Sequence, residues 1–277
     1  MYVHLLRIAH LAVWEWPGEG PPILFTHATG FHGRVWDRII IPGRHCFAID
    51  LRGHGRSDKN LQSYDWRRFG EDTAMVAKEL GLRGAVGVGH SLGGHAMALA
   101  AAIEPAAFSS LLLVDPVIQM PDRYDGHRKE VDFIARRRAR WKSVEEMFER
   151  FRVRLPFSTW KPEILRDYCE FGLLPDGDEL VLACPPEIEA TIYERSNWPD
   201  ADISEELSQI HIDTTVMRSG KLMTREKFDL SASATDPDLA ARMPNARDVY
   251  LPECSHFIPM EEPKLVINAL KEGSQRP

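Results

Sequence analysis

The feature that most constrains the fold is a strand, a tight turn and a helix in direct succession between residues 85 and 103. Ala85–His90 is a short apolar run, and Leu92–Ile103 is rich in alanine and leucine, both strong helix formers. Between them, the pattern Gly89-His90-Ser91-Leu92-Gly93 sets a serine between two glycines. Such a turn exposes the serine at the end of the strand, beside the positive N-terminus of the helix. This context favours a nucleophilic Ser91 over a glycine-rich turn that only packs.

Apolar runs and helical patterns extend this unit in both directions. Runs typical of buried strands are Val3–Ile8, Leu11–Trp16, Pro22–His27, Cys46–Leu51, Ser109–Asp115, Asp213–Arg218 and Ala246–Leu251. Helical patterns cover Asp65–Leu80 and Pro263–Leu270, and residues 225–243 are expected to be partly helical. Alternating strands and helices predict an α/β fold with a mostly parallel central sheet and helices on both of its faces.

The alternation is interrupted after Asp115 and resumes near residue 207. The intervening chain is charged, rich in proline and helical in pattern. We therefore expect a core formed by residues 1–116 and 207–277, with residues 117–206 inserted as a helical cap. An insertion at the carboxyl end of a strand lies near the edge where open α/β sheets bind ligands.

Composition excludes several classes of protein. A chain of 277 residues can bury a large core without disulfides or metal staples, and its net charge of −7 argues against a general nucleic-acid binder. The four cysteines lie far apart and form no C-x-x-C pair, which is typical of a cytoplasmic protein without a zinc knuckle. The N-terminal residues do not resemble a secretory signal, and no apolar run is long enough to span a membrane. Neither nucleic acid nor membrane is therefore an expected partner.

Four motifs of the predicted core belong together. They are Phe25–Gly30, Asp50–Asp58, Gly89–Gly93, and Ser255-His256-Phe257 followed by Glu262-Pro263. The set resembles the α/β-hydrolase fold superfamily, in its branch of cap-bearing serine esterases and related hydrolases. In that superfamily the first motif is the oxyanion loop, the second a D-x-R-G-x-G-x-S turn, and the last the segment of the catalytic histidine. The resemblance covers the core, leaves the cap unmatched, and implies a triad that works without a metal or an organic cofactor.

A serine hydroxyl is a weak nucleophile that needs a base, and the base needs an acid to orient it. The resemblance implies that His256 is the base. It also implies that the oxyanion is held by two backbone N–H groups, those of Leu92 and Thr29, because such donors are already oriented. Ala28 stands where the superfamily usually has glycine.

The acid is the open member of the triad. Its usual place in the superfamily, after the strand 213–218, holds Met223. An alternative place, at the end of the preceding strand, holds Asp115, and the order serine, aspartate, histidine agrees with the superfamily. Asp115 could instead serve only to cap a turn, in which case Glu226 or Asp229 would be the acid.

Three further residues are candidates for substrate binding: His27, Trp141 and Trp160. His27 is expected mainly to organise its loop through hydrogen bonds. The two tryptophans belong to a set of cap aromatics that either line an apolar pocket or pack the cap on the core. The basic stretch Arg123–Lys142 is either a solvated face or a patch that attracts an anionic substrate.

These residues predict a serine hydrolase that acts on a small carboxylic ester or a related acyl substrate through an acyl-enzyme. The same triad serves carbon–carbon bond hydrolysis and cofactor-free perhydrolysis in this superfamily, and some members are weakly catalytic small-molecule receptors. The sequence does not separate these activities. Haloalkane dehalogenation is disfavoured because position 91 is serine, whereas dehalogenases of this fold use aspartate. A small-molecule acyl substrate is the partner that we expect, and the oligomeric state is not predicted.

Overall fold

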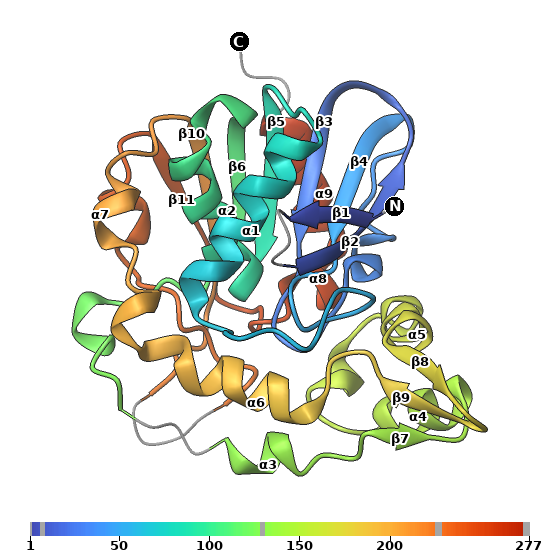
Figure 1. The fold of residues 1–277 in the computed structure, drawn as a ribbon. Helices are drawn as coiled ribbons and strands as arrows, with labels where there is room; N and C mark the ends of the chain where they lie inside the picture. Colours follow the sequence, from blue (N-terminus) through green and yellow to red (C-terminus); the bar gives the residue numbers. More distant parts are fainter. Residues whose placement is uncertain (1, 6–8, 128–130, 225–228, 274–277) are drawn as a thin grey trace.

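A computed structural model describes residues 2–5, 9–127, 131–224 and 229–273 of the chain. Within these residues, eight strands form one sheet in the order β1-β2-β4-β3-β5-β6-β10-β11 (Figure 1). Their bounds are β1 Tyr2–Leu5, β2 Ala9–Trp16, β3 Glu19–Thr26, β4 Arg44–Ile49, β5 Ala85–His90, β6 Phe108–Val114, β10 Asp213–Ser219 and β11 Ala246–Leu251. The strands from β4 to β11 are parallel, and β2 is antiparallel to both β1 and β4. The mostly parallel sheet that the sequence predicts is confirmed.

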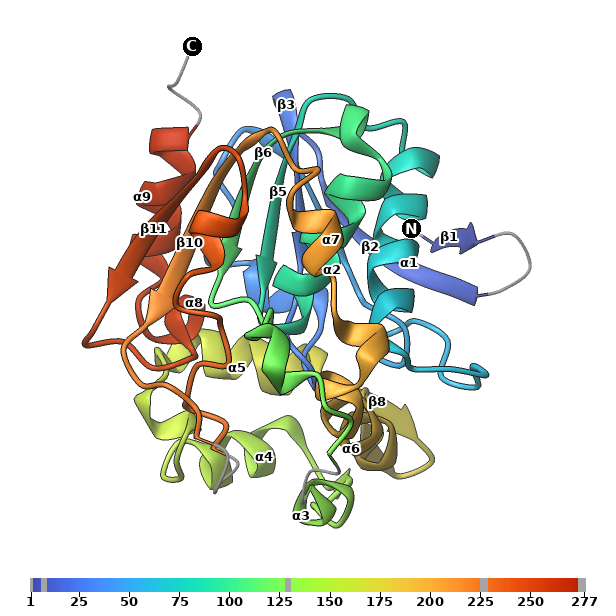
Figure 2. The same cartoon turned by 90° about the vertical axis from the view of Figure 1, so that its left-hand side faces the viewer.

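Helices cover both faces of this sheet. On one face, α1 (Trp66–Glu79) packs against α2 (Leu92–Ile103), and on the other lies α9 (Pro263–Gly273) (Figure 2). Each face has its own apolar layer. Leu111 and Leu113 of β6 belong to the layer under α2, whereas the alternate strand residues contribute to the layer under α9. No described helix is long and apolar enough to cross a membrane.

The chain between β6 and α7 (Ser204–Leu207) forms a separate layer, towards which the arrowheads of β5, β10 and β11 point (Figures 1 and 2). We call residues 117–206 the insert. Its elements are α3 Asp132–Ala135, β7 Arg140–Trp141, α4 Val144–Phe151, α5 Pro162–Phe171, β8 Leu173–Asp176, β9 Glu179–Leu182 and α6 Pro186–Glu194. The three strands form a small antiparallel sheet, β7-β9-β8. The sequence predicted helices only, because strands of two to four residues are too short to show a strand period.

Two segments near the C-terminus form short helices. Between β10 and β11 the described residues contain a short 3-10 helix, Leu239–Arg242, within the stretch 225–243 that was expected to be partly helical; residues 225–228 lie outside the described part. A short helix, α8 (Ile258–Glu261), precedes α9. The other 3-10 helices are Gly33–Trp36, Pro105–Ala107, Pro121–Arg123, Phe157–Thr159, Arg195–Asn197 and Pro199–Ala201.

Candidate active site

The turn between β5 and α2 holds Ser91 in a strained conformation. Ser91 (φ 58°) and Asp115 (φ 43°) are the non-glycine residues with positive φ in the described part of the chain. The two glycines of the turn permit close packing: a Cβ on Gly89 would lie 2.3 Å from the carbonyl oxygen of Gly93, and a Cβ on Gly93 2.3 Å from that of Thr26. Strain at isolated residues often marks a functional site. The local spacing G-x-S-x-G is therefore a requirement of the backbone at this point.

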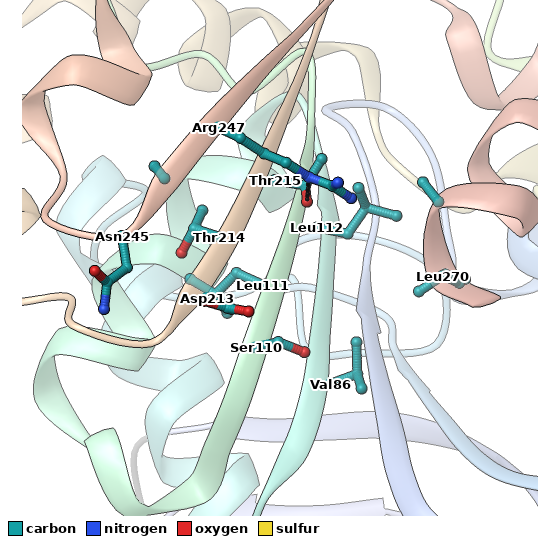
Figure 3. A pocket seen from close by; sticks show the side chains of 12 residues that line it. Val86, Ser110, Leu111, Leu112, Asp213, Thr214, Thr215, Asn245, Arg247 and Leu270 are labelled. Carbon is teal, nitrogen blue, oxygen red and sulfur yellow. Dashed lines mark hydrogen bonds between the residues drawn. The ribbon is translucent and has the colours of Figure 1, made fainter. Parts of the chain in front are cut away.

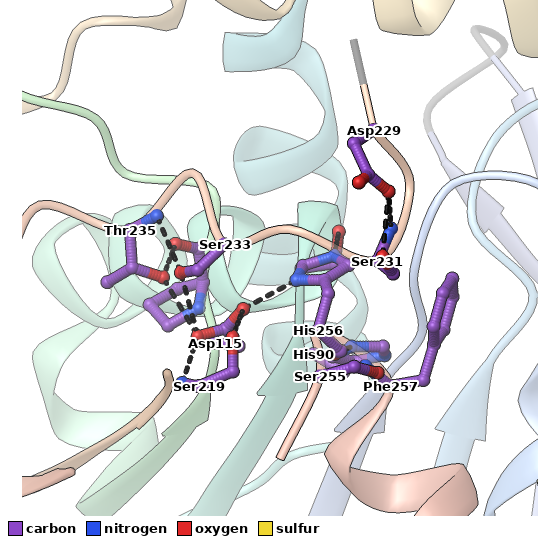
Figure 4. Close-up of polar contacts among 12 residues, drawn as sticks. His90, Asp115, Ser219, Asp229, Ser231, Ser233, Thr235, Ser255, His256 and Phe257 are labelled. Atoms are coloured by element: carbon purple, nitrogen blue, oxygen red, sulfur yellow. Dashed lines mark hydrogen bonds and ion pairs between the residues drawn. The ribbon is translucent and has the colours of Figure 1, made fainter. Parts of the chain in front are cut away.

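At the carboxyl edge of the sheet, the His256 ring faces Asp115 (Figure 4), and its other nitrogen contacts Ser91. His256 Nε2 lies 2.9 Å from Ser91 Oγ, and His256 Nδ1 lies 2.6 Å from Asp115 Oδ2. A carboxylate can only accept a hydrogen bond, so Nδ1 carries the proton and Nε2 is left to accept the serine hydroxyl. All three side chains are buried. This arrangement is the one that a nucleophile, its base and an orienting acid require.

Asp115 is the most strongly hydrogen-bonded carboxylate of the site. Its oxygens accept from the Ser219 amide (2.7 Å), the Ser219 hydroxyl (3.2 Å) and the Ser233 hydroxyl (2.9 Å). The Thr235 hydroxyl lies 3.5 Å from Asp115 Oδ1 and donates to the Pro116 carbonyl oxygen at 2.7 Å. A buried carboxylate is costly unless such donors are present. The sequence analysis did not identify these donors, although small hydroxyl residues alternate with alanine over Ser231–Thr235.

His256 is held through its backbone as well as its ring. Its N–H donates to the Ser231 carbonyl oxygen (3.0 Å), and its own carbonyl oxygen accepts from His90 Nε2 (2.8 Å). Burial lowers the pKa of His90 to about 3, so this ring is neutral and its single proton is on Nε2. The next residue, Phe257, stacks on Phe31 with ring centroids 6.3 Å apart. The orientation of the His256 ring is therefore fixed from several sides.

Of the other predicted acids, Asp229 has no contact with His256 among the described residues. Asp229 accepts from Lys221 Nζ (2.5 Å) and from the Ser231 hydroxyl (2.7 Å), on the far side of His256 from Asp115 (Figure 4). Partial burial raises the pKa of Asp229, but these hydrogen bonds outweigh it and lower the pKa to about 2. Glu226 lies outside the described residues. The geometry therefore supports Asp115 as the acid.

In the loop of residues 28–31, the amides of Ala28 and Thr29 have no hydrogen-bond acceptor among the described residues, whereas those of Gly30 and Phe31 do. The Gly30 N–H donates to His54 Nε2 (2.9 Å), and the Phe31 N–H donates to the Ala28 carbonyl oxygen (3.1 Å). The Thr29 N–H has no acceptor among the described residues. Gly30 itself has φ +82°, a conformation that glycine adopts without strain.

The second predicted oxyanion donor is the amide of Leu92. Leu92 is the first residue of α2, so its N–H has no carbonyl oxygen one turn earlier in the helix to bind. The Thr26 hydroxyl donates to the Gly93 carbonyl oxygen (2.8 Å) and so joins the end of β3 to the first turn of α2. The strand that leads into the 28–31 loop and the helix that carries Leu92 are thereby held together.

His27 and His54 brace two loops against each other. His27 donates from Nδ1 to the Ala28 carbonyl oxygen (2.8 Å) and accepts the Leu51 N–H at Nε2 (3.0 Å). His54 donates in the same way to the Arg52 carbonyl oxygen (2.8 Å) while its Nε2 accepts from Gly30, and the two rings are 5.0 Å apart. Burial lowers the pKa of both rings, that of His27 to about 3. Because backbone groups occupy both ring nitrogens of His27, the structure supports the loop-organising interpretation over substrate contact.

The two predicted tryptophans differ in their surroundings. Trp160 lies against Phe31 (5.4 Å between ring centroids) and Phe257 (5.2 Å), so it adjoins the residue that follows His256. Trp141 packs inside the insert against Phe151 (5.4 Å) and under the Arg138 guanidinium (4.2 Å). These contacts support a place beside the substrate for Trp160 and a packing role for Trp141.

A cavity of about 260 Å³ lies at the opposite end of the sheet (Figure 3). Its lining includes Ser110, Thr214 and Arg247, from the amino-terminal halves of β6, β10 and β11. Ser91 and Asp115 follow the carboxyl ends of their strands, so this cavity is not part of the candidate active site. Within the described residues, no group of three or more histidine, cysteine, aspartate or glutamate side chains could hold a metal ion. That the chemistry needs no cofactor stays a prediction.

Comparisons with known proteins give the wider context. A sequence model described as "Alpha/beta hydrolase family" matches residues 23–269. A non-heme chloroperoxidase of Streptomyces lividans is 36% identical over 109 residues, which are 37% of this chain and 40% of that protein. A bifunctional esterase/perhydrolase of Acinetobacter calcoaceticus is 34% identical over 127 residues, 42% of this chain and 46% of that protein. The matches thus span less than half the length of these curated relatives.

Solved structures extend the likeness over the whole chain. The crystal structure of E-2-(acetamidomethylene)succinate hydrolase covers 100% of both chains, with a TM-score of 0.79 and 20% sequence identity. A thioesterase domain from the curacin biosynthetic pathway covers 98% of both chains, with a TM-score of 0.75 and 21% identity. At these identities the likeness shows the fold alone.

Proposed function

This chain belongs to the alpha/beta hydrolase family, and on that premise we propose that it is a serine hydrolase that cleaves a small carboxylic ester or a related acyl compound. The observation that carries the proposal is the continuous path of hydrogen bonds from Ser91 Oγ through the His256 ring to Asp115. Each group has the partner that its role requires: the nucleophile Ser91 is hydrogen-bonded to the base His256, and His256 is hydrogen-bonded to the buried acid Asp115.

In the first half of the reaction, His256 Nε2 takes the proton of the Ser91 hydroxyl while Oγ forms a bond to the substrate carbonyl carbon. The carbonyl π electrons move to its oxygen, and the N–H groups of Thr29 and Leu92 donate to that oxyanion. The intermediate collapses, the bond to the leaving oxygen breaks, and His256 donates its proton to the leaving alcohol. Ser91 is then esterified by the acyl group.

In the second half, water replaces the alcohol. His256 Nε2 takes a proton from the water as its oxygen bonds to the acyl carbon, and the Ser91 ester bond breaks as the second intermediate collapses. The proton returns to Ser91 Oγ, and the carboxylic acid leaves. Asp115 remains ionised throughout; it fixes the tautomer of His256 and stabilises the imidazolium that forms.

We assign the insert the role of a cap over this site. Trp160 is its one predicted substrate-binding residue that packs against the core beside His256, through Phe31 and Phe257. Together these three rings offer an apolar surface for the acyl group.

The test is hydrolysis of p-nitrophenyl esters with acyl chains from acetate to octanoate. The wild type should turn over at least one of them, and Ser91→Ala should lower kcat/KM by about 10⁴-fold or more, since the members of a triad act as a unit. Circular dichroism would check that the variant is folded. An unchanged rate in Ser91→Ala, or no turnover of any ester by the wild type, would contradict the proposal.

A second candidate function is perhydrolysis. It is favoured by the similarity of part of the chain to the chloroperoxidase and the esterase/perhydrolase. Hydrogen peroxide would then replace water in the second half, so that the acyl-enzyme yields a peroxy acid and free Ser91. Bromide oxidation in the presence of hydrogen peroxide and acetate would detect the peroxy acid. The signal should vanish in Ser91→Ala; if it persists there, or is absent in the wild type, this candidate is wrong.

A further inference from the structure

Side chains of the insert converge on the loop of residues 28–31. Glu189 of α6 packs against Gly30 so closely that a Cβ at Gly30 would lie 2.5 Å from Glu189 Oε1. The hydroxyl of Tyr193, also on α6, lies 3.5 Å from the Thr29 carbonyl oxygen, and that of Tyr168 on α5 lies 3.5 Å from the Gly30 carbonyl oxygen. Two consecutive peptide groups of a core loop are thus contacted by two helices of the insert.

A buried ion pair ties these side chains together. Arg137 Nη2 lies 2.6 Å from Glu189 Oε2, and the Glu189 side chain is only 7% exposed. Arg137 also interacts with the Tyr168 hydroxyl, and its Nε is buried without a hydrogen-bond partner among the described residues. Burial raises the pKa of Glu189, while the neighbouring guanidinium counteracts that shift. We call Arg137, Tyr168, Glu189 and Tyr193 the Glu189 cluster.

Stability alone does not account for this cluster. A buried ion pair loses most of its attraction to the cost of removing two charges from water, and apolar residues of similar volume stabilise a fold as well or better. Apolar contacts pack much of the rest of the insert, for example through Met147, Trp160 and Leu165, although Asp167 of α5 also forms an ion pair with Arg38 of the core. The placement of a charged pair against Gly30 therefore needs another reason.

The loop itself supplies that reason. From the core side, His54 accepts the Gly30 N–H at 2.9 Å. From the side of the insert, Tyr193 approaches the carbonyl oxygen of the same Thr29–Gly30 peptide group. Both ends of this peptide group are thus held, and the free N–H of Thr29 lies one peptide group earlier. The direction of that N–H depends on both contacts.

We propose that the Glu189 cluster positions the 28–31 loop so that the Thr29 N–H points at the oxyanion. Its members are positioning residues, and the insert thereby takes part in the chemical step as well as covering the site. The inference rests on the proposed function. A misdirected donor weakens binding of the transition state while leaving ground-state binding of the substrate almost unchanged, so the effect should fall on kcat rather than KM.

The test compares Arg137→Met, Glu189→Gln and the double variant Arg137→Met/Glu189→Leu. Each single change leaves a buried group without its partner, whereas the double change replaces both charges by apolar side chains. The matched control is Arg166→Met/Glu145→Leu, which removes an exposed 2.8 Å pair from the same insert. The measurements are the melting temperature, kcat and KM for a p-nitrophenyl ester, and the rate of amide hydrogen exchange in residues 28–31.

We expect both single variants to lose melting temperature and kcat. The double variant should regain the melting temperature but keep a kcat about tenfold below wild type, with KM within about twofold, because a small misplacement of a catalytic group suffices for such a loss. Its loop amides should exchange faster than in wild type, and the control should match wild type in every measurement. Recovery of kcat and of slow exchange together with the melting temperature would show a structural role only and overturn the proposal.

If the double variant does not fold, Tyr193→Phe tests the same proposal, since it removes one hydroxyl of the Glu189 cluster and keeps the ring. It should lower kcat about threefold and speed exchange in residues 28–31, and unchanged values of both would overturn the proposal. The exchange measurement does not need a substrate. A wild type that hydrolyses no ester would contradict the proposed function, while the exchange rates would still decide whether the cluster holds the loop.

Discussion

The core and the insert each bury a carboxylate beside the candidate active site, and they hold it in different ways. Asp115 follows a strand of the main sheet and accepts hydrogen bonds from His256, from the backbone and side chain of Ser219, and from the Ser233 hydroxyl. Glu189 lies on a helix of the insert and has one charged partner within the described part of the chain, Arg137. Asp115 is therefore organised before any substrate arrives, whereas the geometry around Glu189 depends on how the insert packs on the core.

The largest effect should come from the core carboxylate. Asp115→Asn should keep the fold but lower kcat by about 10⁴-fold, because an amide can leave His256 in the wrong tautomer. Asp229→Asn is the matched control on the other side of His256 and should change kcat by less than about twofold, since its carboxylate is bound to Lys221 and Ser231. Steady-state hydrolysis of one ester measures both. A loss in Asp229→Asn that equals the loss in Asp115→Asn would place the acid elsewhere.

The next effect concerns stability in acid and comes from the core alone. Five histidines are buried there with lowered pKa values: His27 and His90 at about 3, His32 and His95 at about 4, and His54 well below its ordinary value. In the unfolded chain each titrates near 6.5. Below that pH the unfolded state binds protons that the folded state does not, so stability falls as the pH drops from about 6.5 towards 4.

The measurable quantity is the slope of the free energy of unfolding against pH. Each histidine contributes up to about 1.4 kcal/mol per pH unit to the free energy of unfolding, so urea unfolding at two pH values below 6.5 should show a steep loss. His95→Gln should reduce the slope by about one fifth, because it removes one of the five groups. A free energy of unfolding that stays constant over this range would contradict the burial of these rings as neutral groups.

A smaller effect should come from the contact that holds the 28–31 loop from the core side, the hydrogen bond from the Gly30 N–H to His54. His54→Phe leaves the Gly30 N–H buried without an acceptor, which should cost about 1–3 kcal/mol of stability and lower kcat about tenfold. His54→Gln keeps an amide oxygen that can accept this N–H and should fall between His54→Phe and wild type. Thermal unfolding and ester hydrolysis would test both variants. Equal values for the two variants would show that the acceptor at position 54 does not hold the loop.

The smallest effect should come from a single donor to Asp115. Ser233→Ala removes the 2.9 Å hydrogen bond to Asp115 and the acceptor of the Thr235 N–H (3.1 Å), and it should lower kcat about threefold, since Ser219 still provides two donors to Asp115. Thr235→Val removes a contact of 3.5 Å to Asp115 and a hydrogen bond of 2.7 Å to the Pro116 carbonyl oxygen, and it should have less effect on kcat because the hydroxyl proton is bound to Pro116. The reverse order in a side-by-side assay would contradict the assignment of Ser233 as the stronger of the two donors to Asp115.

The difference between the core and the insert also explains which parts of the site could be predicted from the sequence. Ser91 is identified by local spacing, because the glycines that its turn requires are two residues away on either side. Asp115 and His256 were predicted from the resemblance to the α/β-hydrolase superfamily, which places the acid and the histidine after strands of the sheet, and Glu226 and Asp229 stayed open as alternative acids. The donors Ser219 and Ser233 could not be found in this way, because they reach Asp115 from positions more than 100 residues distant in sequence.

The insert was less predictable for a related reason. No motif covers it, its strands are short, and Glu189 has no local signal that would relate it to Gly30, which is a contact between distant segments. Trp141 and Trp160 look alike in sequence and differ only in what tertiary packing sets beside them. Periodicity predicted helices here, and the packing of those helices on the core decides which residues adjoin the site.

The central claim is that Ser91 is an activated nucleophile whose base is oriented by Asp115. The most direct measurement is the rate at which a fluorophosphonate labels the folded protein, with the adduct located by mass spectrometry in wild type, Ser91→Ala and Asp115→Asn. We predict rapid labelling at Ser91 in wild type, none at this position in Ser91→Ala, and labelling slowed by about 10³-fold or more in Asp115→Asn. Labelling elsewhere, or an equal rate in wild type and Asp115→Asn, would contradict the account.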